Sequence, residues 1–185
     1  HGFNETPDNM SFIKELLRGA THAKLLFSFD KKWKNPPQIL CAVDIDESDT
    51  EQKMLNDAVF KSAYQDLAPP LSAKLHLATV IEMSKVSNEL DIIEPGEVLD
   101  KNFSQYKESL LKFEATHPCG EVQMHIKAGI AAKEIPSLAA KQKADIVVIG
   151  NVGRERLAGF FIGNTAEKTF RSLACDVLIV NRFAK

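Results

Sequence analysis

The sequence predicts an α/β fold: a five-stranded, mostly parallel sheet with helices on both faces. Short apolar runs alternate along the chain with segments whose apolar residues recur at helical spacing. The clearest run is ADIVVIG, residues 144–150, which is typical of a strand buried on both faces. Because consecutive strands are separated by helices, we expect them to pair in parallel through right-handed crossovers. In such a sheet, ligands bind beyond the carboxyl ends of the strands.

The predicted elements of this sheet lie between about residues 38 and 181. Five strands are expected at residues 38–43, 73–81, 121–127, 144–150 and 175–181. Four helices are expected between them, one from Ser48–Thr50 to Pro69-Pro70 and others at 103–116, 130–143 and 164–173. The connection from about residue 82 to residue 102 is long, and connections of this length are often functional.

The first 37 residues do not follow this plan. Residues 11–20 are expected to form a short helix and residues 23–29 a strand. The segment LLRGATHAKLLFSF is similar to FRSLACDVLIVNRF near the other end of the chain, which is a weak internal repeat. We therefore expect residues 1–36 to be the final helix and strand of a preceding copy of the domain plus a linker, and residues 37–185 to be the domain itself. An unrelated amino-terminal extension is the alternative.

Composition and charge disfavour several classes of protein. The chain has 185 residues and a formal net charge of −2 without a basic run, so nucleic acid is not an expected partner. No apolar stretch approaches the roughly 18 residues that a membrane helix needs. Three widely spaced cysteines without a CxxC motif favour a reduced, cytoplasmic protein. The five histidines form no metal-binding pattern, and no catalytic nucleophile or base is indicated.

A glycine-rich segment follows the clearest strand and opens the last helix. It contains Gly150, Gly153 and Gly163, together with Arg154 and Arg156. Glycines allow the backbone to approach a ligand closely, and the N–H groups at the start of a helix favour an anion. The segment is either a phosphate cradle or a tight loop whose glycines only serve turns, and the spacing alone favours neither.

Other phosphate-binding motifs are absent from the sequence. There is no GxxxxGK[ST], which excludes a P-loop, and the first strand is followed by acidic residues instead of GxGxxG. Asp44 and Asp46 are similar to the acidic pocket of response-regulator receivers. That fold needs a phospho-accepting aspartate after its third strand, where this sequence has HIKAG, so a receiver domain is disfavoured.

Three segments, ILCAVDIDES, ADIVVIGNVG and GNTAEKTFRSLACDVLIV, together resemble the universal stress protein family. Its ATP-binding members carry the pattern G-x2-G-x9-G-[ST], and Gly150, Gly153 and Gly163 match its glycines. Asn164 stands where the pattern has Ser or Thr, although Asn can still donate a hydrogen bond to a phosphate oxygen. The resemblance covers about residues 37–182 and implies a Rossmann-like fold of the adenine nucleotide alpha hydrolase-like type.

The resemblance implies a binding site for ATP, with Mg²⁺ offsetting the acidic residues after the first strand. Asp44 matches the family's aspartate that contacts the nucleoside, and it has a second interpretation as a helix-capping acid. Val80 matches the position whose backbone faces adenine. Gly150 is expected beneath the ribose and phosphates, and the phosphates are expected at Gly153, Arg154, Gly163, Asn164 and Thr165. Any hydrolysis of ATP is expected to be slow.

The resemblance also implies a partner for the last strand. In this family the final strand of each domain pairs antiparallel with the final strand of its partner, and residues 175–181 are that strand here. Residues 23–29 are expected to pair with it inside the chain, as the remnant of a tandem-repeat partner. Homodimerisation is expected to compete for the same edge.

Three hypotheses about function remain open on the sequence. The leading one is a nucleotide-binding regulatory module of the stress response, in which ATP acts as a switch. The second is an interaction module that works by dimerisation or partner binding without nucleotide, which Asn164 and the acidic loop favour. The third is a carrier of an apolar small molecule, with residues 82–102 as a lid.

Overall fold

The fold is built on one sheet whose strands lie in the order β1-β6-β5-β2-β3-β4. The computed structural model describes residues 24–28, 31–45, 50–82, 95–151 and 164–181. Strands β2 to β6 are parallel, which confirms the predicted five-stranded sheet, and β1 adds a sixth, antiparallel strand. The strands are β1 (Lys24–Phe27), β2 (Gln38–Ala42), β3 (Lys74–Glu82), β4 (Val122–Gly129), β5 (Ile146–Asn151) and β6 (Asp176–Asn181).

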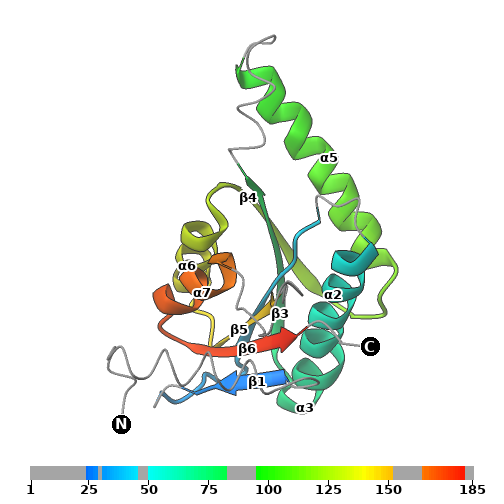
Figure 1. The fold of residues 1–185 in the computed structure, drawn as a ribbon. Coiled ribbons are helices and arrows are strands. Elements are labelled where there is room, and N and C mark those ends of the chain that lie inside the picture. Colours follow the sequence, from blue (N-terminus) through cyan, green and yellow to red (C-terminus); the bar gives the residue numbers. More distant parts are fainter. Residues whose placement is uncertain (1–23, 29–30, 46–49, 83–94, 152–163, 182–185) are drawn as a thin grey trace.

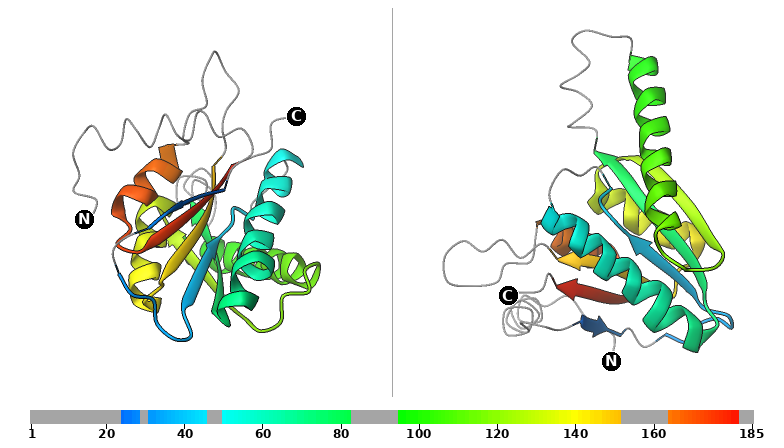
Figure 2. Two further views of the ribbon diagram at one scale, coloured as in Figure 1. Left: turned by 90° about the horizontal axis from the view of Figure 1, so that it is seen from below. Right: turned by 90° about the vertical axis from the view of Figure 1, so that its right-hand side faces the viewer.

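Helices cover both faces of this sheet, as predicted (Figure 1). One face carries α6 (Ala131–Gln142) and α7 (Asn164–Ser172). The other face carries α5 (Pro95–Ala115) and a second helical stretch. That stretch runs from α2 (Thr50–Lys61) through a π-helical segment (Ser62–Leu67) into α3 (Ala68–Leu71). The two views of Figure 2 show the helices on either side of the strands.

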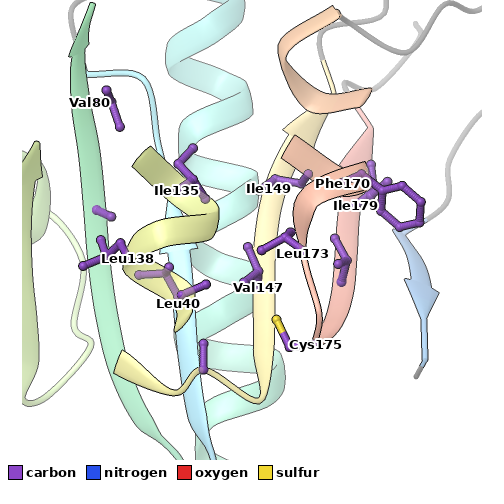
Figure 3. Close-up of a cluster of buried hydrophobic side chains, with 14 residues drawn as sticks. Leu40, Val80, Ile135, Leu138, Val147, Ile149, Phe170, Leu173, Cys175 and Ile179 are labelled. Carbon is purple, nitrogen blue, oxygen red and sulfur yellow. The ribbon is translucent and has the colours of Figure 1, made fainter. Parts of the chain in front are cut away.

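Each face of the sheet has its own hydrophobic core. Successive side chains of a strand point to opposite faces, so Val147 of β5 packs with α6 and α7, whereas Val148 packs in the core beneath α2. Figure 3 shows the first of these cores, to which Leu138 of α6 and Phe170 of α7 contribute. Both valines are fully buried, which explains why β5 is an uninterrupted apolar run.

Two predicted helix boundaries are wrong. Helix α5 begins at Pro95 and not at residue 103, so much of the predicted 82–102 connection is helical. Proline suits the first helical position because its φ is already helical and its missing N–H is not needed there. Pro69 and Pro70 do not end the first helix, since they lie in the first turn of α3, which ends at Ser72 with a left-handed φ of 50°.

Strand β1 pairs antiparallel with β6 inside the chain, which is the pairing expected for residues 23–29. Lys24 lies opposite Val180, and Phe27 lies opposite Val177. Because β1 occupies the outer side of β6, the apolar last strand of the parallel sheet is covered by main-chain pairing on both sides.

Two buried aspartates hold the linker between β1 and β2 against the amino ends of β5 and β6. Asp176 accepts a hydrogen bond from the indole N–H of Trp33 at 2.8 Å. Asp145 accepts from the backbone N–H of Gln38 at 2.8 Å and of Lys34 at 3.2 Å, and its carboxylate lies 3.4 Å from the Lys34 ammonium. These charge-assisted bonds attach the linker, and through it β1, to the parallel sheet.

Candidate functional site

The candidate site lies at the topological switch point of the sheet. Strand β2 pairs with β3 on one side and with β5 on the other. The chain therefore winds outward in opposite directions from β2, towards β4 on one side and β6 on the other. In open parallel sheets, ligands bind where the strand order reverses, beyond the carboxyl ends of the strands. Here that place lies beyond Ala42 of β2 and Asn151 of β5.

Asp44 lies just beyond β2, and its backbone is held by a buried asparagine of α2. Its side chain is exposed, as a ligand-contacting residue requires. The backbone N–H of Asp44 donates to Asn56 Oδ1 at 3.2 Å, and Asn56 Nδ2 donates to the Asp44 carbonyl at 2.5 Å. Asn56 is only 4% exposed, so this contact is shielded from water. The structure therefore places Asp44 at the switch point in a defined backbone position.

Gly150 lies near the end of β5, where α2 packs closely on the strand. A Cβ at this position would lie 2.9 Å from Leu55 Cδ2 and 3.2 Å from Val59 Cγ2. Such distances are well inside ordinary carbon–carbon contact. The packing of α2 is thus sufficient to explain a glycine here, a cause that the glycine spacing of the sequence did not reveal.

Val80 lies in β3, which ends at Glu82, one residue beyond the predicted strand 73–81. Its side chain is buried and points into the core beneath α6 (Figure 3). The resemblance assigned a role only to its backbone. The Val43 N–H donates to the Ala78 carbonyl at 3.0 Å, just where the pairing of β2 with β3 ends. By the alternation of a parallel strand, the backbone of Val80 faces the side on which β2 has ended.

The predicted phosphate contacts lie only partly within the described residues. Asn164 and Thr165 are the first two residues of α7, so the main-chain N–H groups of this turn belong to a helix start. Gly153, Arg154 and Gly163 lie outside the described residues. The structure therefore brings Asp44 and Gly150 to the switch point, places Val80 beside it and puts Asn164 and Thr165 at the start of α7.

Sequence reasoning missed the buried amides at this edge of the sheet. Asn151 Nδ2 donates to Asn181 Oδ1 at 2.9 Å, joining the last residues of β5 and β6. Asn56 was missed as well, although one signal was present. It is polar, yet it lies between Leu55 and Val59 on the buried side of its helix.

Comparison with known proteins identifies the family to which this fold and site belong. The family model described as "Universal stress protein family" matches residues 37–181. The chain belongs to the universal stress protein family. The match begins one residue before β2 and ends with β6, so it includes the whole parallel sheet of this universal stress protein.

Two curated relatives of this universal stress protein are longer than the chain. Universal stress protein E of Salmonella typhi is 28% identical over 153 residues, which are 82% of this chain and 49% of that protein. Universal stress protein E of Escherichia coli K12 is 26% identical over 153 residues, which are 82% of this chain and 48% of that protein. The chain thus spans about half the length of the curated relatives it matches.

Solved structures share the fold of this universal stress protein. A functionally unknown protein of Pseudomonas aeruginosa PAO1 is 31% identical with a TM-score of 0.70, over 96% of this chain and 57% of that chain. A universal stress protein solved in complex with cAMP is 23% identical with a TM-score of 0.51, over 79% of this chain and 97% of that chain. At that identity the second likeness establishes the fold alone.

Two histidines and two cysteines among the described residues of this universal stress protein lie in structural settings. His76 Nδ1 and His125 Nε2 are 3.0 Å apart, and His76 Nε2 lies 3.0 Å from Gln38 Oε1, which supports the predicted structural role of these histidines. Burial raises the pKa of the Cys41 thiol, and raises that of Cys175 to about 11, so both stay protonated at neutral pH.

Among the described residues, no group of three or more His, Cys, Asp or Glu residues could hold a metal ion. No helix there is long and apolar enough to cross a membrane.

Proposed function

We propose that this universal stress protein domain is a nucleotide-binding regulatory module of the stress response, with ATP as its ligand. The observation that carries the proposal is the position of Asp44, exposed beyond β2 at the switch point and held there by Asn56. Membership of the family supports it, and so does the solved cAMP complex of a protein with the same fold. Bound nucleotide would act as a regulatory switch, and any hydrolysis of ATP would be slow.

The proposed roles follow from where each residue lies. The Asp44 carboxylate would contact the nucleoside, and the backbone of Val80 would face the adenine ring. The phosphates would lie at the start of α7, where Asn164 and Thr165 present helix N–H groups to an anion. The roles of Gly153, Arg154 and Gly163 in holding the phosphates remain predictions. Mg²⁺ would offset the repulsion between the triphosphate and the acidic residues that follow β2.

Titration calorimetry of the whole chain with ATP and ADP, with and without Mg²⁺, tests this function. We expect modest affinity that Gly153→Val abolishes, because a side chain would fill the space between backbone and phosphate. Gly159→Val is the matched control, since Gly159 lies in the same segment but outside the glycine pattern. No binding by the unaltered chain at millimolar nucleotide would refute the proposal.

An interaction module without nucleotide is the second candidate, and Asn164, which stands where the ATP-binding pattern has Ser or Thr, favours it. We propose that residues 1–36 belong to a preceding domain of the same family. The alignment with the Pseudomonas aeruginosa structure supports this, because it includes 96% of this chain but only 57% of that one. A homodimer through residues 175–181 would have to displace β1. Light scattering of the chain with and without residues 1–36 tests this competition, with dimerisation expected to be stronger in the shorter chain.

A further inference from the structure

The hydrogen bonds of β2 show which neighbour each of its residues faces. In parallel strands, alternate residues bond to the neighbours on opposite sides. The Gln38 carbonyl accepts from the N–H of Asp145 at 2.8 Å, so the even-numbered residues of β2 face β5. The N–H of Val43 donates to the Ala78 carbonyl at 3.0 Å, so the odd-numbered residues face β3. By this alternation, the backbone N–H and carbonyl of Asp44 are expected to point towards β5.

The main chain of Asp44 does not continue the pairing with β5. The register between the two strands ends with Ala42 opposite Ile149. One step further, with residue 44 opposite Asn151, the Asp44 N–H would reach the Gly150 carbonyl. Instead, the amide of Asn56 binds both the N–H and the carbonyl of Asp44. A side chain thus replaces the neighbouring strand at the first position beyond the ladder.

Helix α2 contacts the carboxyl ends of both β2 and β5. Gln52 Nε2 donates to Asn56 Oδ1 at 3.1 Å, which fixes the orientation of the amide that binds the backbone of Asp44. On the next strand, Leu55 and Val59 of the same helix pack against Gly150. The helix therefore contacts the ends of β2 and β5 from one rigid surface, and Asn56, being buried, cannot exchange its partner for water.

We infer that Asn56 is a positioning residue that keeps the carboxyl ends of β2 and β5 apart, so that a nucleoside can contact Asp44 between them. The nucleoside as occupant rests on the proposed function. The separation itself rests only on the hydrogen bonds of this structure. Asn56 would act on the nucleoside part of the ligand and not on the phosphates, because its partner Asp44 lies just beyond β2, whereas the start of α7, where the phosphates are expected, follows β5.

Hydrogen-bond scalar couplings measured by NMR on the intact, ligand-free chain test the separation. We expect a coupling between the Asp44 amide nitrogen and the side-chain carbonyl carbon of Asn56, and none to the Gly150 carbonyl carbon. In Asn56→Leu, whose side chain has the same branched shape without the amide, the Asp44 amide should instead couple to Gly150 as the ladder extends. A coupling to Gly150 in the unaltered chain, or none in Asn56→Leu, would overturn the spacer role.

Binding measurements test the positioning role. In Asn56→Leu, the affinities for ATP and adenosine should each fall about tenfold, as the loss of a fixed polar contact implies, while that for tripolyphosphate stays within about twofold. Ser62→Ala is the matched control, because it removes a buried hydrogen bond to the Ala58 carbonyl on the same helical stretch without touching Asp44. A general loss of stability would weaken all three ligands alike, and unchanged ATP affinity would overturn the inference.

A milder variant covers the case in which Asn56→Leu does not fold, and the NMR couplings cover the case in which the chain binds no nucleotide. Should Asn56→Leu fail to fold, Asn56→Asp keeps the acceptor for the Asp44 N–H but loses the donor to its carbonyl, and a smaller loss of ATP and adenosine affinity is expected. If the unaltered chain binds no nucleotide, the proposed function fails, and the couplings alone then support or overturn the spacer role of Asn56.

Discussion

Gly150→Ala separates a packing role of this glycine from a role in ligand binding. The added Cβ would lie 2.9 Å from Leu55 Cδ2, 3.0 Å from Leu55 Cγ and 3.2 Å from Val59 Cγ2. Optimal carbon–carbon separations are about 3.5–4.0 Å, so these side chains or α2 itself must retreat by about 0.5–1 Å. Leu55 and Val59 are each only 1% exposed and have no free space to move into.

The free energy of unfolding is expected to fall on balance. Overpacking of a dense core costs about 1–3 kcal/mol. Alanine also restricts the unfolded chain, which returns about 0.4–1 kcal/mol where the backbone suits it, and Gly150 has no left-handed φ. A net loss of about 1–2 kcal/mol remains, and for a chain of this length each kcal/mol lowers Tm by about 2–4 °C.

A double-mutant cycle with Leu55→Ala, followed by urea denaturation, measures the contact directly. Leu55→Ala alone is expected to cost about 2–5 kcal/mol because it leaves a cavity. In the double variant, the alanine at position 150 fills part of that cavity, so the combined loss should be smaller than the sum by about 1 kcal/mol or more. Additive losses, or a Gly150→Ala variant as stable as the unaltered chain, would refute the packing explanation. A stable variant that had lost ATP binding would favour the ligand role.

Three further predictions concern the rest of the domain. Burial, with Lys74 beside His76 and with His76, Lys127 and Lys141 near His125, lowers the pKa of both histidines. The unfolded chain therefore binds more protons below about pH 6.5, and the free energy of unfolding, measured by urea denaturation, should fall from pH 7 to pH 5 by up to about 1.4 kcal/mol per pH unit for each histidine. His76→Gln should flatten this slope, and a slope that it leaves unchanged would contradict the assignment. Asp145→Asn should destabilise by about 2–3 kcal/mol and speed amide exchange in β1, because both carboxylate oxygens accept hydrogen bonds. Lys34→Ala removes the half-exposed ion pair with Asp145 and an exposed hydrogen bond to the Lys143 carbonyl, and should cost under about 1 kcal/mol. Equal losses would argue against the aspartate as the anchor of the linker. Asn164→Ser should tighten ATP binding a few-fold by calorimetry, as one neutral hydrogen bond of about 1 kcal/mol allows, and unchanged affinity would mean that Asn164 does not limit binding.

Much of the fold could be predicted because its signals are local. A strand buried on both faces must be apolar along its whole length, so ADIVVIG identified β5 without knowledge of its neighbours. The alternation of such runs with helical segments was sufficient for a parallel sheet with helices on both faces. Helix ends were less predictable. The residues after Pro95 lack a strong apolar period, and Pro69 is compatible with either a stop or a new first turn.

The sequence by itself determined the family and the edge of the sheet at which a ligand would bind, because both depend on short motifs, each made of residues that are neighbours along the chain. Only the tertiary structure assigned a cause to Gly150, since Leu55 and Val59 lie far from it in sequence and reach it by the packing of α2. The same holds for Asn56. An asparagine on a helix predicts nothing about a strand. Its hydrogen bonds to Asp44 form because folding packs α2 against the end of β2, where the pairing of β2 with β5 stops.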